Sequence, residues 1–214
     1  MMRTLLRILF PEPCAMCGLL GESLCSACFQ RVKFEPHVRE LEGLQVCSAL
    51  YYEEESVVGR LVRPFKYSHQ ADLFRIFVPW MREALRLLGE RGEVVFVPVP
   101  LHKSRELERG YNQSELLARW LASSLGQRLW KGLVRTRDTG SQARLSDRQS
   151  REENIKSAFE VAGAIPGYPI VLVDDIVTTG STLLACSETL RAAGAKNIFA
   201  LTLADREKKT NHWH

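Results

Sequence analysis

The sequence predicts an α/β fold in which a parallel twisted sheet is flanked by helices and preceded by a small four-cysteine zinc module. Three observations lead to this prediction. Apolar, β-branched runs alternate with segments of helical spacing, the last two such runs enclose one helix, and two Cys-x-x-Cys pairs precede them all. With 214 residues, the chain can form one α/β domain and a small appendage.

The four clustered cysteines form two Cys-x-x-Cys pairs separated by seven residues: Cys14, Cys17, Cys25 and Cys28. Two such turns can place four thiolates around one metal ion, and a reducing compartment favours metal over disulfide. We predict a structural zinc, since four protein ligands leave no position for a substrate. Thiol–disulfide redox chemistry is the alternative. The module, residues 1–36, is too short for a core of its own.

The elements that follow are expected from apolar spacing. Residues 45–52 and 94–99 are strand candidates, and residues 57–65 and 73–88 have helical spacing, with Pro64 and Pro79 obscuring the helix ends. Cys47 and Cys186 lie in apolar surroundings and are expected to be core thiols.

The second half of the chain begins with a helix expected near Asn112, because Asn112 and Glu115 resemble a capping box. Residues 133–136 are a short strand candidate, and residues 137–157 have no clear period and are expected to form a long loop. One βαβ unit is then expected from the following segments: strand 170–173, helix 181–193 and strand 198–203. The domain would span residues 37–204, and the polar residues 205–214 would form a flexible tail.

The composition is that of a soluble globular protein. Hydrophobic residues make up 45% and charged residues 25%, which excludes a mainly disordered or collagen-like chain. No run approaches the roughly 18 apolar residues of a membrane helix, and the first ten residues lead to no small-residue cleavage site. We therefore expect a cytoplasmic protein without a transmembrane segment.

The positive charge is concentrated in one stretch. The formal net charge is +4, and residues 128–156 carry eight Lys or Arg against four Asp or Glu, a surplus of four. This surplus favours a polyanionic ligand or partner nearby. A solvated basic loop would carry the same charge and is the alternative.

The most informative run is residues 170–182, IVLVDDIVTTGST. A buried strand delivers Asp174 and Asp175 at its carboxyl-terminal end, where parallel sheets bind ligands. A turn of hydroxyls and one glycine then leads into a helix N-terminus, which suits a phosphate. Two carboxylates suit sugar hydroxyls or a divalent cation. A sugar phosphate therefore matches both the acid pair and the turn that suits a phosphate. The residues of the turn are Val177, Thr178, Thr179, Gly180, Ser181 and Thr182.

Other motifs that bind nucleotides or phosphate match this sequence less well. The chain has no Gly-x-x-x-x-Gly-Lys-Ser/Thr, which a Walker-type nucleotide site needs, and no two of its 14 glycines are two residues apart, as a dinucleotide site requires. A phospho-receiver domain would place its paired acids after its first strand. In the remaining alternative, Asp174 and Thr178 only cap a turn.

Residues 170–182 resemble the phosphoribosyl-pyrophosphate motif of type I phosphoribosyltransferases. Further segments resemble the competence protein F (ComF) family, together with the cysteine pairs. They are residues 97–102 (VPVPLH), residues 108–113 (ERGYNQ), Gln142, Leu145, Arg151, Asn154 and residues 158–159. The resemblance covers residues 6–204, nearly the whole chain.

The resemblance implies a set of site residues. Asp174 and Asp175, the candidate catalytic residues, would hold the ribose 2′- and 3′-hydroxyls, and the turn after them would cradle the 5′-phosphate. The loop of residues 98–103 would contact pyrophosphate, with a magnesium ion bridging pyrophosphate and ribose; it includes Pro100, Leu101, His102 and Lys103. A flexible basic loop would close over the ligand and would carry Gln142, Arg144, Arg148, Arg151 and Asn154. The spacing from Leu145 to Asn154 leaves the roles of Arg148 and Arg151 open.

Three functions follow from the resemblance. The chain would be a phosphoribosyltransferase of nucleotide metabolism with an unidentified acceptor, a non-catalytic sensor of phosphoribosyl pyrophosphate, or a factor in DNA uptake during natural transformation, and we expect the sensor and the DNA-uptake factor to coexist in one protein. The last would act on single-stranded DNA, with a competence helicase or recombination protein as partner.

Some residues keep two interpretations. His102 is either a general base or phosphate donor, or a polar surface residue. Three aromatic residues could stack on bases beside a basic path, or could belong to the core: Tyr111, Trp120 and Trp130. The path would comprise Arg105, Arg109, Arg128, Lys131, Arg135 and Arg137.

Overall fold

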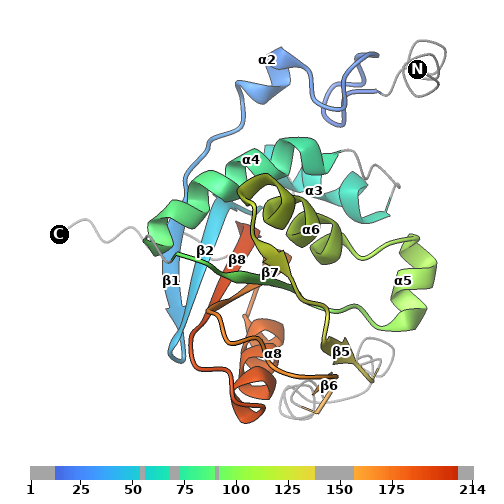
Figure 1. Cartoon of the computed structure of the whole chain (residues 1–214). Coiled ribbons are helices and arrows are strands. Elements are labelled where there is room, and N and C mark those ends of the chain that lie inside the picture. Colours follow the sequence, from blue (N-terminus) through green and yellow to red (C-terminus); the bar gives the residue numbers. More distant parts are fainter. Residues whose placement is uncertain (1–12, 54–55, 68–72, 90–91, 138–156, 207–214) are drawn as a thin grey trace.

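The computed structural model describes residues 13–53, 56–67, 73–89, 92–137 and 157–206 of the chain. Within them, a six-stranded sheet has the order β1-β2-β8-β7-β3-β4 and lies between two layers of helices (Figure 1). The predicted α/β class is therefore confirmed. The strands of this sheet are β1 (His37–Leu41), β2 (Leu44–Tyr51), β3 (Val95–Pro98), β4 (Arg128–Leu129), β7 (Ile170–Val177) and β8 (Ile198–Asp205).

The sheet is mixed rather than wholly parallel. Five strands, from β2 to β4 in the order above, pair in parallel, whereas β1 pairs antiparallel with β2 at the edge. Glu42 and Gly43, both with positive φ, form the two-residue turn between β1 and β2. The sequence analysis did not identify β1, because its polar side chains obscure the strand pattern.

Helices cover both faces of the sheet. Three of them, α3, α4 and α6, lie on one face, and α8 lies on the other (Figure 1). Alternate residues of β7 divide between the two cores, with Val171 and Val173 facing one layer and Ile170 and Leu172 the other. The helices are α2 (Ser26–Phe29), α3 (Val57–Tyr67), α4 (Phe74–Leu85), η2 (Arg86–Leu88), α5 (Lys103–Arg109), α6 (Gln113–Leu125) and α8 (Ser181–Ala192).

Several predicted boundaries are close to the observed ones. Asn112 caps α6, because its side chain accepts hydrogen bonds from the backbone N–H groups of Ser114 and Glu115. The predicted βαβ unit is β7-α8-β8, with its two strands parallel. The short strand predicted at residues 133–136 is β5 (Leu133–Arg135), which pairs with β6 (Phe159–Val161) in a separate two-stranded sheet.

Two predicted boundaries are wrong. β7 does not stop before the acids but continues through Asp174 and Asp175 to Val177. Asp205 is not part of a tail: it is the last residue of β8 and fully buried, and Arg39 of β1 supplies the cation that neutralises it. Pro64 and Pro79 end no helix, since each lies inside one. Residues 138–156 and 207–214, which include most of the predicted loop and tail, lie outside the described residues.

Candidate functional site

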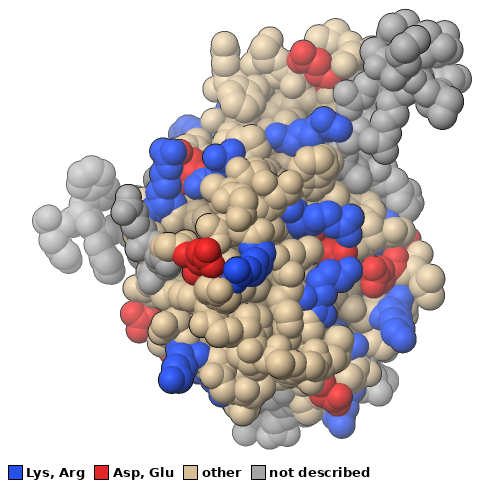
Figure 2. All heavy atoms as spheres, in the orientation of Figure 1, with Lys and Arg blue, Asp and Glu red and all other residues tan. Residues whose placement is uncertain are grey.

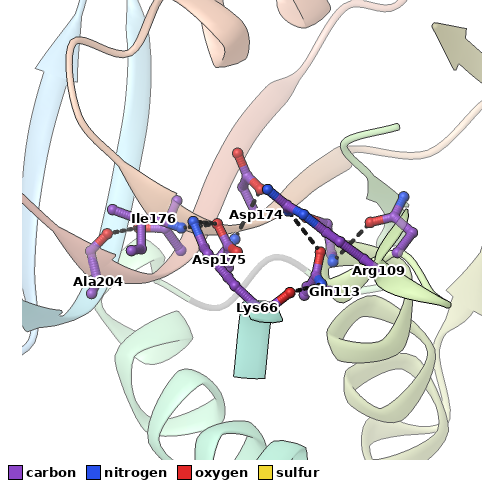
Figure 3. A network of polar contacts seen from close by, with 10 residues as sticks. Lys66, Arg109, Gln113, Asp174, Asp175, Ile176 and Ala204 are labelled. Carbon is purple, nitrogen blue, oxygen red and sulfur yellow. Dashed lines mark hydrogen bonds and ion pairs between the residues drawn. The ribbon is translucent and has the colours of Figure 1, made fainter. Parts of the chain in front are cut away.

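The candidate site lies at the carboxyl ends of β7 and β3. After β3, the backbone N–H of Val99 still donates to the carbonyl of Val173, 2.9 Å away, so that the following loop leaves the sheet beside the end of β7. The end of β7 leads through a short turn into α8, while the start of α6 and the last turn of α3 approach the acids from the opposite layer (Figures 1 and 3).

Asp174 has two neutral hydrogen-bond donors. Its Oδ1 accepts from the hydroxyl of Ser114, 2.7 Å away, and from the backbone N–H of Asp175, 2.9 Å away. Burial, followed by the neighbouring charge of Asp175, raises the pKa of Asp174 to about 7, while the hydrogen bond from Ser114 and the charge of Lys66 act in the opposite direction. Asp174 is therefore an acceptor whose charge changes near neutral pH.

Asp175 has a charged partner. It is 6% exposed, and its Oδ1 lies 3.1 Å from Nζ of Lys66 and 2.6 Å from the backbone N of Ile176 (Figure 3). Burial alone would lower the pKa of Lys66, but the charges of Asp175 and then Asp174 outweigh burial and raise it. Lys66 is therefore charged and neutralises part of the acid pair.

Residues just before and within the first turn of α6 hold the surrounding elements together. The hydroxyl of Tyr111 donates to the carbonyl of Phe65 at the end of α3. The amide of Asn112 donates to the carbonyl of Val99 over 3.1 Å, at the start of the loop that follows β3. The ERGYNQ segment thus contacts both the helix that carries Lys66 and the predicted pyrophosphate loop.

The predicted phosphate turn joins β7 to α8. Its side chains bond to one another, with 3.1 Å between the hydroxyls of Thr179 and Ser181. Gly180 has φ 83°, and a Cβ atom there would lie 2.2 Å from Cδ1 of Leu41. The positive φ therefore favours glycine, and the end of the Leu41 side chain would have to shift to make room for a Cβ atom. The first-turn N–H groups of α8 lack intrahelical acceptors and lie at the positive end of the helix dipole, which suits an anion.

A buried ion pair supports this turn from β1. Arg39 Nε lies 2.9 Å from Asp205 Oδ2, and the same guanidinium donates to the carbonyl of Thr178 over 3.0 Å. Nε2 of His37 lies 3.5 Å from the same Asp205 oxygen. The inward-facing residues of β1 occur at alternate positions, so a period-two pattern in HVREL was the available sequence signal.

The predicted pyrophosphate loop ends where α5 begins. Pro100 and Leu101 lie in the loop, His102 is the N-cap of α5, and Lys103 is its first helical residue. Nδ1 of His102 accepts from the backbone N–H of Ser104 and lies 2.9 Å from its hydroxyl. The described contacts therefore give His102 a capping role at the helix start.

The four predicted metal ligands lie together. The Sγ atoms of Cys14, Cys17, Cys25 and Cys28 are all within 4.8 Å of one another. Burial would raise the pKa of Cys14, but hydrogen bonds from the Cys25, Cys17 and Met16 backbones lower it to about 6, whereas burial and the neighbouring cysteines raise the pKa of Cys28 to about 12, so that one sulfur favours the thiolate and another the thiol until a metal ion binds. The donor set therefore fits a closed tetrahedral metal site. Cys47 and Cys186 are buried, as predicted for core thiols.

The structure does not gather every predicted residue. Gln142, Arg144, Arg148, Arg151 and Asn154 lie outside the described residues. Trp120 is 42% exposed and stacks on Phe74 with 4.6 Å between ring centroids, so it is not a core residue. On the face that Figure 2 shows, Lys and Arg side chains alternate with Asp and Glu rather than forming one continuous basic path.

Sequence reasoning missed three residues that contact the predicted site: Lys66, Ser114 and Arg39. Lys66 and Arg39 lie far from the acids in the chain, so no local motif includes them. Ser114 directly follows the ERGYNQ segment, so of the three it was the one that the sequence could have identified.

No described helix is both long and apolar enough to cross a membrane.

Sequence and structure comparisons relate this chain to known proteins. A family model described as a phosphoribosyl transferase domain matches residues 113–214. Competence protein F of Haemophilus influenzae is 32% identical over 206 residues, covering 85% of this chain and 90% of the relative. DNA utilization protein YhgH of Salmonella typhimurium is 35% identical over 191 residues, covering 86% and 80%. Adenine phosphoribosyltransferase of Saccharomyces cerevisiae, a solved structure, is 17% identical with a TM-score of 0.43, covering 85% of this chain and 89% of that one.

Proposed function

This chain belongs to the competence protein F family, whose members are phosphoribosyltransferase-like, and we propose on that premise that it binds phosphoribosyl pyrophosphate with magnesium. The observation that carries the proposal is the position of Asp174. It lies in the carboxyl-terminal half of β7, which continues to Val177 before the short turn into α8, and the loop that follows β3 leaves the sheet next to it. A ligand with vicinal hydroxyls between two anionic groups matches this arrangement.

Each part of the ligand has a proposed partner. Asp174 accepts hydrogen bonds from the ribose hydroxyls, and the turn from Val177 to Thr182 receives the 5′-phosphate through backbone N–H and hydroxyl groups. The loop of residues 98–103 receives the pyrophosphate. Magnesium, as part of the bound ligand, supplies charge neutralisation at the phosphates.

The same site supports two biochemical outcomes. In a transferase, the bond between C1 of the ribose and pyrophosphate breaks, positive charge develops on the ring, and an acceptor then bonds to C1 while pyrophosphate leaves. The chain's residues would orient the ribose and stabilise the departing anion. In a sensor, the ligand binds without turnover. The described residues contain no side chain that identifies an acceptor, so the acceptor stays unassigned.

Calorimetry with phosphoribosyl pyrophosphate and MgCl₂ tests the proposal. We expect the wild type to bind and Asp174→Asn to lose about 30-fold or more in affinity, about 2 kcal/mol, because a charged acceptor is lost. Glu83→Gln, an exposed carboxylate on α4, is the matched control and should bind like the wild type. Pyrophosphate release over hours separates a transferase from a sensor. A wild-type protein that gives no binding heat would refute the proposal.

We further propose that the cysteine cluster binds zinc. Residues 1–36 would form the metal module and residues 37–204 the ligand-binding domain. Thiolate coordination of zinc is typical of reducing compartments, which supports a cytoplasmic location.

A second candidate function is binding of single-stranded DNA. The exposed ring of Trp120, which stacks on the buried Phe74, favours it, because Arg75 lies 5.4 Å from the Phe74 ring and Arg119 precedes Trp120 in the chain. Aromatic platforms beside cations bind single strands with little sequence preference. We expect oligonucleotide affinity to fall with rising salt and to fall about tenfold in Trp120→Ala. Equal affinity of variant and wild type would refute this face as the binding site.

A further inference from the structure

The two neighbouring aspartates of β7 have partners of different charge. The Oδ1 atom of Asp174 accepts from two neutral donors, the Ser114 hydroxyl and a backbone N–H. The Oδ1 atom of Asp175 instead lies 3.1 Å from the ammonium of Lys66 (Figure 3). The carboxylates are adjacent in sequence, but only Asp175 forms a direct ion pair with Lys66.

Lys66 is held in place by its backbone as well as by its ion pair. It lies in the last turn of α3, where backbone carbonyls lack intrahelical partners. The carbonyl of Phe65 accepts from the Tyr111 hydroxyl, and the carbonyl of Lys66 accepts from the Gln113 amide over 3.4 Å. The Lys66 side chain is 20% exposed. Its ammonium is therefore placed by the fold, unlike that of an ordinary surface lysine.

The charges around Lys66 indicate how its ammonium group changes the electrostatics of the acid pair. Asp174 and Asp175 face Lys66 from β7, and Arg109 adds positive charge from α5. Two ionised carboxylates alone would carry two negative charges next to a site proposed for a strongly anionic ligand. With Lys66, the three groups carry one. Repulsion of the ligand is therefore reduced by the ammonium, which lies 3.1 Å from Oδ1 of Asp175.

We propose that Lys66 is a positioning residue that neutralises and fixes Asp175, which leaves Asp174 as the carboxylate that binds the ribose hydroxyls. This inference rests on the proposed binding of phosphoribosyl pyrophosphate and deepens it, because it separates two aspartates that the sequence motif treats as equivalent. The main alternative is that Lys66 contacts the ligand directly, and the two cases differ in how Lys66 and Asp175 depend on each other.

A double-mutant cycle measures that dependence. Lys66→Met, Asp175→Asn and the double variant are titrated with phosphoribosyl pyrophosphate and MgCl₂ by calorimetry. We expect Lys66→Met to weaken binding about 20-fold and Asp175→Asn about threefold, and the double variant to bind no worse than Asp175→Asn. Lys66→Arg should restore binding to within about threefold of the wild type, because it keeps the charge. Lys196→Met makes the same substitution at an exposed lysine before β8 and serves as the control.

The outcomes separate the explanations. If Lys66→Met costs the same affinity with and without Asp175, Lys66 contacts the ligand and the inference is wrong. If Asp174→Asn binds well while Asp175→Asn does not, the assignment of the two carboxylates is wrong. This comparison keeps Lys66 and so remains decisive even if Lys66→Met fails to fold. A wild type that does not bind refutes the proposed function itself, and the inference with it.

Discussion

Replacing Arg39 by methionine should destabilise the fold far more than replacing Arg86, although the two arginines form ion pairs of nearly equal length. Arg39 Nε lies 2.9 Å from Asp205 Oδ2, and Arg86 Nη1 lies 3.0 Å from Glu83 Oε2. The difference is burial, because the Asp205 side chain is 0% exposed and that of Glu83 is 51% exposed. Removing one partner of a buried pair costs about 3–5 kcal/mol, whereas an exposed pair contributes about 0–1 kcal/mol.

Urea unfolding followed by tryptophan fluorescence measures both effects. We expect a loss of about 3–5 kcal/mol for Arg39→Met and of less than about 1 kcal/mol for Arg86→Met.

The double variant Arg39→Met/Asp205→Asn provides the internal control. It removes both charges, so it should be more stable than Arg39→Met alone if the cost comes from an uncompensated buried carboxylate. Equal losses for Arg39→Met and Arg86→Met, at unchanged denaturant slopes, would refute the reasoning that burial decides the strength of the pair.

Three further predictions concern the turn, the metal and the pH dependence. Gly180→Ala should lower the free energy of unfolding by about 2 kcal/mol or more, measured in urea, because its methyl group would meet Leu41. Gly163→Ala, also at positive φ but with nothing within 4 Å, should cost only about 1 kcal/mol. The purified protein should hold about one zinc per chain by elemental analysis, and Cys28→Ser should lose the metal and melt at a lower temperature; a metal-free wild type that is well folded would contradict this. Calorimetry should show ligand affinity rising about tenfold from pH 6 to pH 8. The reason is that the pKa of Asp174, raised to about 7 mainly by burial, requires proton release on binding below that pH. A flat profile would contradict it.

The parts of the fold that were predicted well depend on local sequence. The βαβ unit could be recognised because its strands are apolar on both faces and its helix begins directly after the glycine turn. The start of α6 could be recognised because Asn112 is a strong cap. The cysteine cluster followed from spacing alone, since two short turns bring all four sulfur atoms together.

The parts that were missed depend on pairs distant in the chain. β1 is half polar, and its inward residues are satisfied by Asp205, by Thr178 and by contact with Gly180, all in the last fifth of the sequence. When only the local sequence is considered, these partners are unknown, and the alternating polar residues of β1 resemble those of an exposed segment. The same reasoning applies to Lys66, which looks like an ordinary helix-ending lysine until β7 places Asp175 beside it.

The ERGYNQ segment shows why a polar motif between two helices can be essential to both stability and binding. Asn112 caps α6 and also holds the carbonyl of Val99, while Tyr111 and Gln113 bind the end of α3 that carries Lys66. Ser114, the next residue, donates to Asp174. These bonds join the start of α6 to the end of α3, to the loop after β3 and to β7. A substitution in this segment should therefore change ligand affinity without contacting the ligand, because it moves the groups that do.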